Sequence, residues 1–135
     1  MKKIILAAIL YLGCSVAVLK AQTYQLSSHI LDISTGLPAP KVPVKLAKWN
    51  EKDEIWTAVD QKNTDENGRI KDFLEQSKFT TGIYKLTFLV ADYFKSKNVT
   101  SFYPFIEVVF EIKDNKHYHV PITLSPFGYS TYRGN

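Results

Sequence analysis

The sequence predicts an all-β sandwich for residues 22–135, and three observations support this fold class. Short segments in which apolar and polar residues alternate recur along the chain, separated by turns rich in glycine, proline, asparagine and aspartate. Aromatic residues, which favour strands, are frequent, with 8 tyrosines and 8 phenylalanines in the whole chain. About seven or eight strands at this spacing are typical of a single-domain sandwich.

The alternation places the strands in order. The first is expected over residues 26–33, because a turn containing Gly36 and Pro38 follows it. Residues 92–98 are the one segment expected to be helical, because Asp92 can begin a helix there. Further strands are expected over residues 42–46, 55–59, 84–90, 106–113, 117–124 and 128–133.

The N-terminal segment has the features of a secretory signal. Lys2 and Lys3 precede an apolar run from Ile4 to Leu19, which is shorter than the roughly 20 apolar residues that cross a bilayer as a helix. We therefore expect a signal peptide over residues 1–21, cleaved after Ala21, and an exported protein that is periplasmic or secreted and has no membrane contact afterwards. An uncleaved membrane anchor is the alternative.

Loss of this segment changes both the charge and the cysteine content. The whole chain has a net charge of +4, but residues 1–21 hold three lysines and no acidic residue. The mature chain therefore has 14 basic and 13 acidic residues, and its net charge of +1 gives no support for nucleic-acid binding. The single cysteine, Cys14, is also removed, which excludes disulfides, thiolate catalysis and cysteine–zinc ligation in the mature chain.

Two of the three histidines lie close together near the C-terminus. His117 and His119 are two residues apart, so on a strand they face the same way. The apolar residues that alternate with them must face the core: Tyr118, Val120, Ile122 and Leu124. The histidine face is therefore a second surface, either solvated or covered by another subunit.

His29 shows the same arrangement in the first predicted strand. It shares a face with Gln25 and Ser27, whereas Leu26 and Ile30 occupy the opposite side, which faces the core. Two separate strands thus place imidazole groups on their non-core sides, and histidine is well suited to proton transfer near neutral pH. Ordinary surface histidines and a weak His-x-His metal site are the alternatives.

Two further side chains are candidates for contact with a substrate. Arg69 follows the turn at Gly68, and its planar guanidinium could hold a carbonyl–amide group by two hydrogen bonds, although a solvated arginine is the simpler interpretation. Tyr132 lies in an aromatic C-terminal segment with Tyr129 and Arg133. Such a terminus is expected to be tied down rather than frayed, and the alternative is an edge strand with solvated tyrosines.

The C-terminal sequence from His117 to Gly134 closely resembles that of 5-hydroxyisourate hydrolases, whose chains end in Tyr-Arg-Gly-Ser. The segment from Leu26 to Asp32, followed by Gly36 to Ala39, resembles the N-terminal signature of the same family. The turn from Asp65 to Arg69 resembles the one that carries the family's active-site arginine. The resemblance covers essentially the whole mature chain and departs at Asn135, which stands in place of the family's final serine.

The resemblance implies a transthyretin-like (prealbumin-like) sandwich of two four-stranded sheets with one short helix. It also implies a homotetramer, a dimer of dimers, with sites at the dimer–dimer interface. The catalytic residues would be His29, Arg69 and His119, and the substrate-binding residues His29, Arg69 and Tyr132. The family's reaction uses no cofactor, and no metal is expected.

The implied reaction is the hydrolysis of 5-hydroxyisourate to 2-oxo-4-hydroxy-4-carboxy-5-ureidoimidazoline in urate degradation. Our hypothesis is that His119 and His29 activate a water molecule that attacks the lactam carbonyl, while Arg69 offsets the charge that develops on oxygen. A transthyretin-type carrier of a small molecule and a secreted β-sandwich interaction module are the alternatives. The carrier needs neither the histidine pair nor the Tyr-Arg-Gly end.

Overall fold

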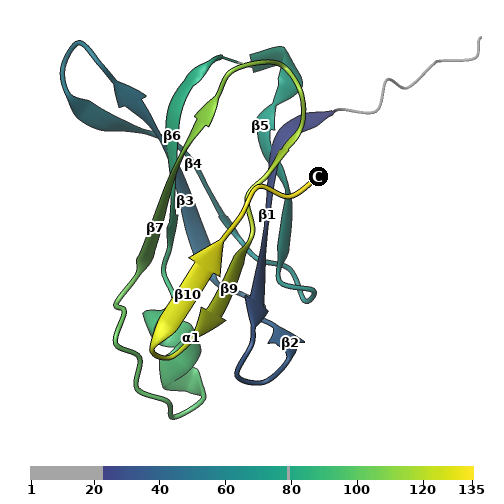
Figure 1. The fold of residues 1–135 in the computed structure, drawn as a ribbon, viewed down its shortest axis with the longest axis vertical. Helices are drawn as coiled ribbons and strands as arrows, with labels where there is room; N and C mark the ends of the chain where they lie inside the picture. The colour runs from purple at the N-terminus through teal and green to yellow at the C-terminus, as the bar shows by residue number, and fades with distance from the viewer. Residues whose placement is uncertain (1–22, 79) are drawn as a thin grey trace, which may run out of the picture.

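The computed structural model describes residues 23–78 and 80–135, which form two packed β-sheets with a short helix at one end (Figure 1). The expected signal peptide over residues 1–21 lies outside the described residues. One sheet has the strand order β4–β3–β6–β7, and all its neighbouring strands are antiparallel. Its strands are β3 (Pro43–Asn50), β4 (Ile55–Asn63), β6 (Gly82–Phe88) and β7 (Ile106–Ile112).

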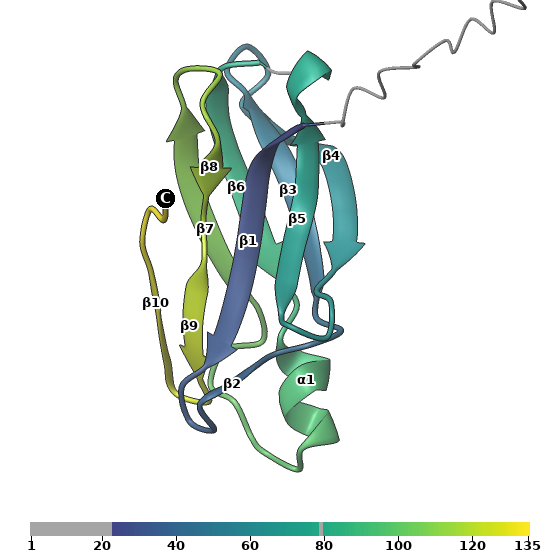
Figure 2. The ribbon, with the colours of Figure 1, turned by 90° about the vertical axis from the view of Figure 1, so that its right-hand side faces the viewer.

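The other sheet is built around β1 (Tyr24–Asp32), as Figure 2 shows. On one side β1 pairs with the antiparallel strand β5 (Arg69–Glu75), and on the other with the parallel segments β8 (Tyr118–His119) and β9 (Ile122–Ser125). The segments β8 and β9 act as one interrupted strand, because in every pair that they form with β1 the β1 residue lies 92 positions earlier. The antiparallel strand β10 (Gly128–Thr131) continues the sheet beyond β9.

The predicted sandwich of two four-stranded sheets with one short helix is confirmed. The two-residue strand β2 (Leu37–Pro38) only extends the end of β1, and a single turn, η1 (Gln76–Lys78), follows β5. The helix α1 (Ala91–Ser96) ends two residues before the predicted end, and Asn98 has a positive φ of 56°, a conformation that terminates helices. Among the described residues, no helix is long and apolar enough to cross a membrane.

The core lies between the two sheets and confirms the predicted orientation of β1, β8 and β9. Leu26 and Ile30 of β1 are fully buried. They pack in one cluster with apolar residues of β8, β9 and the other sheet, among them Tyr118, Val120, Ile122, Leu124, Val44, Leu46, Leu86 and Phe88. Gln25, expected beside Ser27 on the non-core side, is also fully buried, because the loop between β7 and β8 packs against the start of β1 and its Asp114 carbonyl accepts from Gln25 Nε2 at 2.7 Å.

β5 is the strand that the alternation pattern did not predict. Its residues Ile70 and Phe73 are both buried although they are three positions apart. The register of β1 and β5 shifts between Leu26 and Ser28, so that one extra residue is accommodated in β5. This bulge breaks the period of two by which a strand is recognised, and it hid the strand that carries Arg69.

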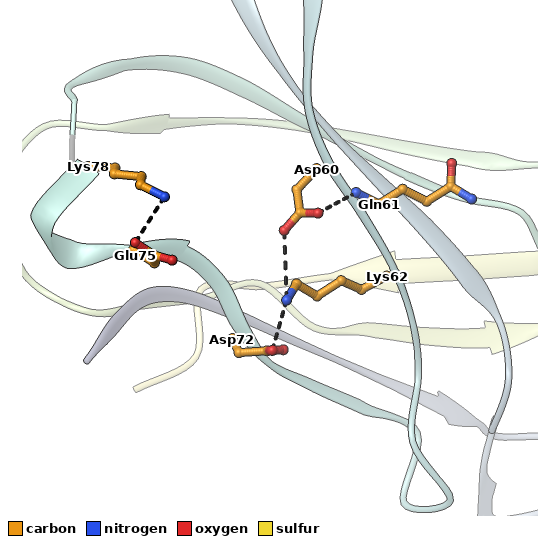
Figure 3. Close-up of polar contacts among 6 residues, drawn as sticks. All are labelled: Asp60, Gln61, Lys62, Asp72, Glu75 and Lys78. Carbon is orange, nitrogen blue, oxygen red and sulfur yellow. Dashed lines mark hydrogen bonds and ion pairs between the residues drawn. The ribbon is translucent and has the colours of Figure 1, made fainter. Parts of the chain in front are cut away.

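An ion-pair cluster joins the edge strands β4 and β5 where the two sheets come together (Figure 3). Lys62 Nζ lies 2.8 Å from Asp72 Oδ2 and 3.8 Å from Asp60 Oδ2. The hydrogen bond with Asp72 is the main cause that raises the pKa of Lys62 above its usual value. The Lys62–Asp72 ion pair thus links β4 of one sheet to β5 of the other.

Candidate active site

The strands β8, β1 and β5 lie side by side in one sheet (Figure 2). Polar residues of all three strands lie on the non-core face of that sheet. Ser27 of β1 pairs with His119 of β8, and His29 of β1 pairs with Arg69 of β5. Ser27 and His29 are two residues apart, so their side chains point to the same side. The structure therefore brings three predicted residues, His119, His29 and Arg69, into one row across three adjacent strands.

The turn before β5 sets the position of Arg69. Asp65 Oδ1 accepts hydrogen bonds from the backbone amides of Asn67 and Arg69 at 2.8 and 2.9 Å. Gly68 has a positive φ of 68°, and a Cβ atom at this position would lie 2.6 Å from the Ile30 carbonyl oxygen. Only glycine allows this close approach of the turn to β1, and the approach places Arg69 opposite His29.

Ser27 connects the two histidines of the His-x-His segment. Its Oγ lies 2.8 Å from His117 Nε2 and 2.8 Å from His119 Nδ1. His117 Nδ1 in turn lies 3.1 Å from the carbonyl oxygen of Tyr24. The imidazole of His119 is therefore held from the β1 side by a chain of hydrogen bonds.

The C-terminal residues hold His119 from the other side. The backbone amide of Gly134 donates to the His119 carbonyl oxygen at 2.8 Å, and a Cβ atom on Gly134 would overlap with His119 Cδ2. The guanidinium of Arg133 lies over the ring of Tyr118, 4.8 Å from its centroid. The terminus is thus tied to β8, as the sequence predicted.

Tyr132 lies at the neighbouring edge of the sandwich. Its side chain is 59% exposed and lines a hollow of about 370 Å³ together with Val108, Phe110 and Tyr118. This hollow opens between β7 and the C-terminal segment rather than on the face of β1. The structure therefore groups His29, Arg69 and His119 and sets Tyr132 apart from them in a single protomer.

The environment of the two site imidazoles favours their neutral forms. Burial is the main cause that lowers the pKa of both His29 and His119 below 6.5, and the positive charge of Arg69 lowers both further. His29 and His117 add to the effect on His119. A backbone hydrogen bond with Asn67 and the negative charge of Asp65 raise the pKa of His29, and a backbone hydrogen bond with Ser27 raises that of His119, without reversing either shift. Both imidazoles can therefore accept a proton at neutral pH.

The comparison with known proteins agrees with this fold and this arrangement of residues. Residues 26–134 match the model of the HIUase/Transthyretin family. The chain belongs to this family. The 5-hydroxyisourate hydrolase of Salmonella typhimurium is 44% identical over 138 aligned positions that cover 100% of both chains. A probable 5-hydroxyisourate hydrolase of Caenorhabditis elegans is 47% identical, over 84% of this chain and 83% of that protein.

Solved structures of the HIUase/Transthyretin fold are also similar to this chain. The crystal structure of sea bream transthyretin in complex with thyroxine superposes with a TM-score of 0.77 at 31% sequence identity. The superposition covers 82% of this chain and 94% of that protein. The sandwich is therefore shared between proteins named as hydrolases and a protein whose structure contains thyroxine.

Two residues of the site in this HIUase/Transthyretin chain were not predicted to have a role. Ser27 was noted only as a neighbour of His29, and Gly134 only as part of the terminal motif. Their contacts depend on the parallel pairing of β1 with β8, which are 92 residues apart, and on the return of the C-terminus to His119. No local sequence pattern indicates either contact.

Within residues 23–78 and 80–135, no group of three or more histidine, cysteine or acidic residues could hold a metal ion.

Proposed function

We propose that the chain hydrolyses 5-hydroxyisourate to 2-oxo-4-hydroxy-4-carboxy-5-ureidoimidazoline at the row formed by His119, His29 and Arg69. The observation that carries this proposal is the pairing of two imidazoles of lowered pKa with a guanidinium on one sheet face. Neutral imidazoles supply a base, and a guanidinium supplies hydrogen-bond donors and positive charge. The two hydrolase relatives, at 44% and 47% identity, support the same reaction.

The proposed reaction begins when an imidazole of the row takes a proton from water. The water oxygen forms a bond to the lactam carbonyl carbon, and the carbonyl oxygen becomes negatively charged next to Arg69. The carbon–nitrogen bond of the ring then breaks, and the imidazolium returns its proton to the departing nitrogen. A positioned general base contributes about 10²- to 10⁴-fold in rate, and an oxyanion donor contributes about 10²- to 10³-fold.

The carrier function has less support, although one solved relative contains thyroxine. Sea bream transthyretin is 31% identical to this chain, less than either of the hydrolase relatives. A carrier also needs no pair of bases of lowered pKa. Catalysis separates the functions directly: the decay of 5-hydroxyisourate absorbance should accelerate in proportion to the concentration of this protein. An unchanged decay rate, together with saturable thyroxine binding, would favour the carrier.

We also propose that the active form is a homotetramer, a dimer of dimers. The edge strand β7 exposes 57% of Val109, and the C-terminal segment exposes 42% of Tyr129 and 59% of Tyr132. Exposed apolar and aromatic side chains on open sheet edges favour association with another chain. A second copy of the chain, packed over the face of β1, would turn the open row of His119, His29 and Arg69 into a cleft. Within this cleft between two copies, Tyr132 would contact the substrate. Light scattering coupled to gel filtration should give four times the mass of the mature chain.

We further propose that residues 1–21 direct export and that the mature enzyme is periplasmic or secreted. The basic start and the short apolar run support this, and the relative from Salmonella typhimurium aligns over the whole chain, including this segment. N-terminal sequencing of the protein recovered from the native host should begin at Gln22. A first residue of Met1 in a membrane fraction would support an uncleaved anchor instead.

A further inference from the structure

The hydrogen-bond chain behind His119 determines which of its nitrogens is free. The chain runs from the Tyr24 carbonyl oxygen to His117 Nδ1, from His117 Nε2 to Ser27 Oγ, and from Ser27 Oγ to His119 Nδ1. A carbonyl oxygen only accepts hydrogen bonds, so His117 Nδ1 must carry a proton and donate it. For a neutral His117 ring, this end of the chain fixes the direction of the hydrogen bonds that follow.

The remaining protons can be assigned in sequence. When His117 is neutral, its ring carries a single proton, so with Nδ1 protonated Nε2 keeps its lone pair and accepts from the Ser27 hydroxyl. Since Ser27 has donated its only proton, its oxygen must accept at its second contact, and the donor is the Nδ1–H group of His119. The Nε2 atom of His119 is then left unprotonated, with its lone pair available to a water molecule.

We propose that Ser27 and His117 are positioning residues that hold His119 in its Nδ1–H tautomer and thereby make His119 Nε2 the base of the reaction. This inference rests on the proposed hydrolase function and deepens it, because it names the base and the atom that takes the proton. A base must be neutral and must present its lone pair to the reacting water. Burial and Arg69 favour the neutral form of the ring, and Ser27 selects the nitrogen.

The contacts around His119 are consistent with a fixed ring rather than a mobile one. Ser27 holds Nδ1 on one side, and the ring carbon Cδ2, adjacent to Nε2, lies against the Cα atom of Gly134 on the other. The hydrogen bonds of Ser27 and His117 therefore select the tautomer, while the packing of Gly134 limits rotation of the ring. If Ser27 contributed only to folding, another small side chain at position 27 would hold the ring equally well, and no hydroxyl would be required.

The test compares Ser27→Ala with Ser27→Thr in the full-length mature protein. Ser27→Ala removes the acceptor for His119 Nδ1–H, whereas Ser27→Thr keeps a hydroxyl at the same position. We expect Ser27→Ala to lower kcat for 5-hydroxyisourate by about 10- to 100-fold, as for other partners that orient a functional histidine, with little change in KM. Ser27→Thr should recover most of the rate. Equal losses in the two variants would overturn the proposal.

A spectroscopic measurement tests the tautomer without any substrate. Nitrogen-15 chemical shifts of the His119 ring distinguish a protonated Nδ1 from a protonated Nε2. The wild-type protein should show protonated Nδ1, and Ser27→Ala should shift His119 toward the Nε2–H tautomer that imidazole prefers in water. Protonated Nε2 in the wild type would refute the relay even if the enzyme is active. The expected tautomer in a protein with no turnover would leave the relay in place and refute the proposed function alone.

Discussion

The strand β5 contributes to two polar clusters that have opposite effects on the charged forms of their members. At the start of the strand, Arg69 lies beside His29 and His119, and its positive charge lowers the pKa of both imidazoles. Three residues further along, Asp72 accepts a hydrogen bond from Lys62 at 2.8 Å, and this contact raises the pKa of the lysine (Figure 3). One cluster sets two neutral imidazoles beside a positive charge, and the other pairs opposite charges.

This difference indicates what each cluster does. The pairing with Asp72 favours the charged form of Lys62, which is the arrangement of a structural contact between sheets. The row at Arg69 disfavours the charged form of its histidines, which lowers the stability of the folded state in acid but keeps two bases neutral. Groups whose pKa is shifted in this way are concentrated at functional sites. The two histidines whose charged form is disfavoured therefore mark the candidate active site.

The largest expected effect comes from His119→Ala. Loss of the base should reduce kcat/KM for 5-hydroxyisourate by about 10²- to 10⁴-fold, while the circular dichroism spectrum and melting temperature stay close to those of the wild type. The fold should survive because the side chain lies on the non-core face. Thr123→Ala, on the same face of the adjacent segment β9, is the matched control and should retain activity. An unfolded His119→Ala protein would show that the faces are assigned wrongly.

Arg69→Lys should reduce kcat/KM by about 10²-fold, in the range measured for the loss of one oxyanion donor. Lysine keeps the positive charge but lacks the planar pair of donors that guanidinium presents to a carbonyl group. Lys71→Ala removes a positive charge from an exposed position of the same strand and should leave the rate unchanged. Wild-type kinetics for Arg69→Lys would reduce Arg69 to a surface charge.

Gly134→Ala should have a smaller effect on kcat, of about 10-fold, as expected when a contact that orients a functional histidine is disturbed. The added methyl group would overlap with the ring of His119, so the ring or the C-terminus must move. Gly128→Ala is a suitable control, because a Cβ atom there lies 3.7 Å from Ser125 Oγ, an ordinary contact. Equal activity of the two variants would show that the C-terminus does not position His119.

The smallest effect is expected for Asp72→Asn. The pair with Lys62 is partly exposed to solvent, with side-chain exposures of 47% and 30%, so its loss should lower the free energy of unfolding by at most about 1 kcal/mol. Hydrolysis should be unaffected. Chemical denaturation and kinetics of the same sample measure both quantities. A loss of activity without a loss of stability would mean that the two clusters on β5 are not independent.

Much of this fold could be predicted from the sequence because most strands alternate with a period of two. That pattern placed Leu26 and Ile30 in the core and the histidines on the opposite face. It failed for β5, where the bulge puts Ile70 and Phe73 on the same side at a spacing of three. A strand of this kind is recognised only once its partner strand is known.

The site could be predicted only in part, and for a similar reason. The family resemblance named His29, Arg69 and His119, which the structure places in one row. The contacts of Ser27 with two histidines 90 and 92 residues away in sequence depend on the pairing of β1 with β8. The contact of Gly134 with His119 depends on the path of the last residues. Such long-range contacts leave no periodic signal in the chain.

An NMR titration of the His29 and His119 rings, in the wild type and in Arg69→Gln, measures directly how the charge of Arg69 affects the pKa of each imidazole. Because the folded-state pKa of each lies below 6.5, their contribution to stability is present above that pH and is lost as the pH falls through the folded-state pKa. Both wild-type midpoints should lie below 6.5, and both should rise when Arg69 loses its charge. Midpoints at or above 6.5, or midpoints that do not move in Arg69→Gln, would contradict the claim that burial and Arg69 keep these imidazoles neutral.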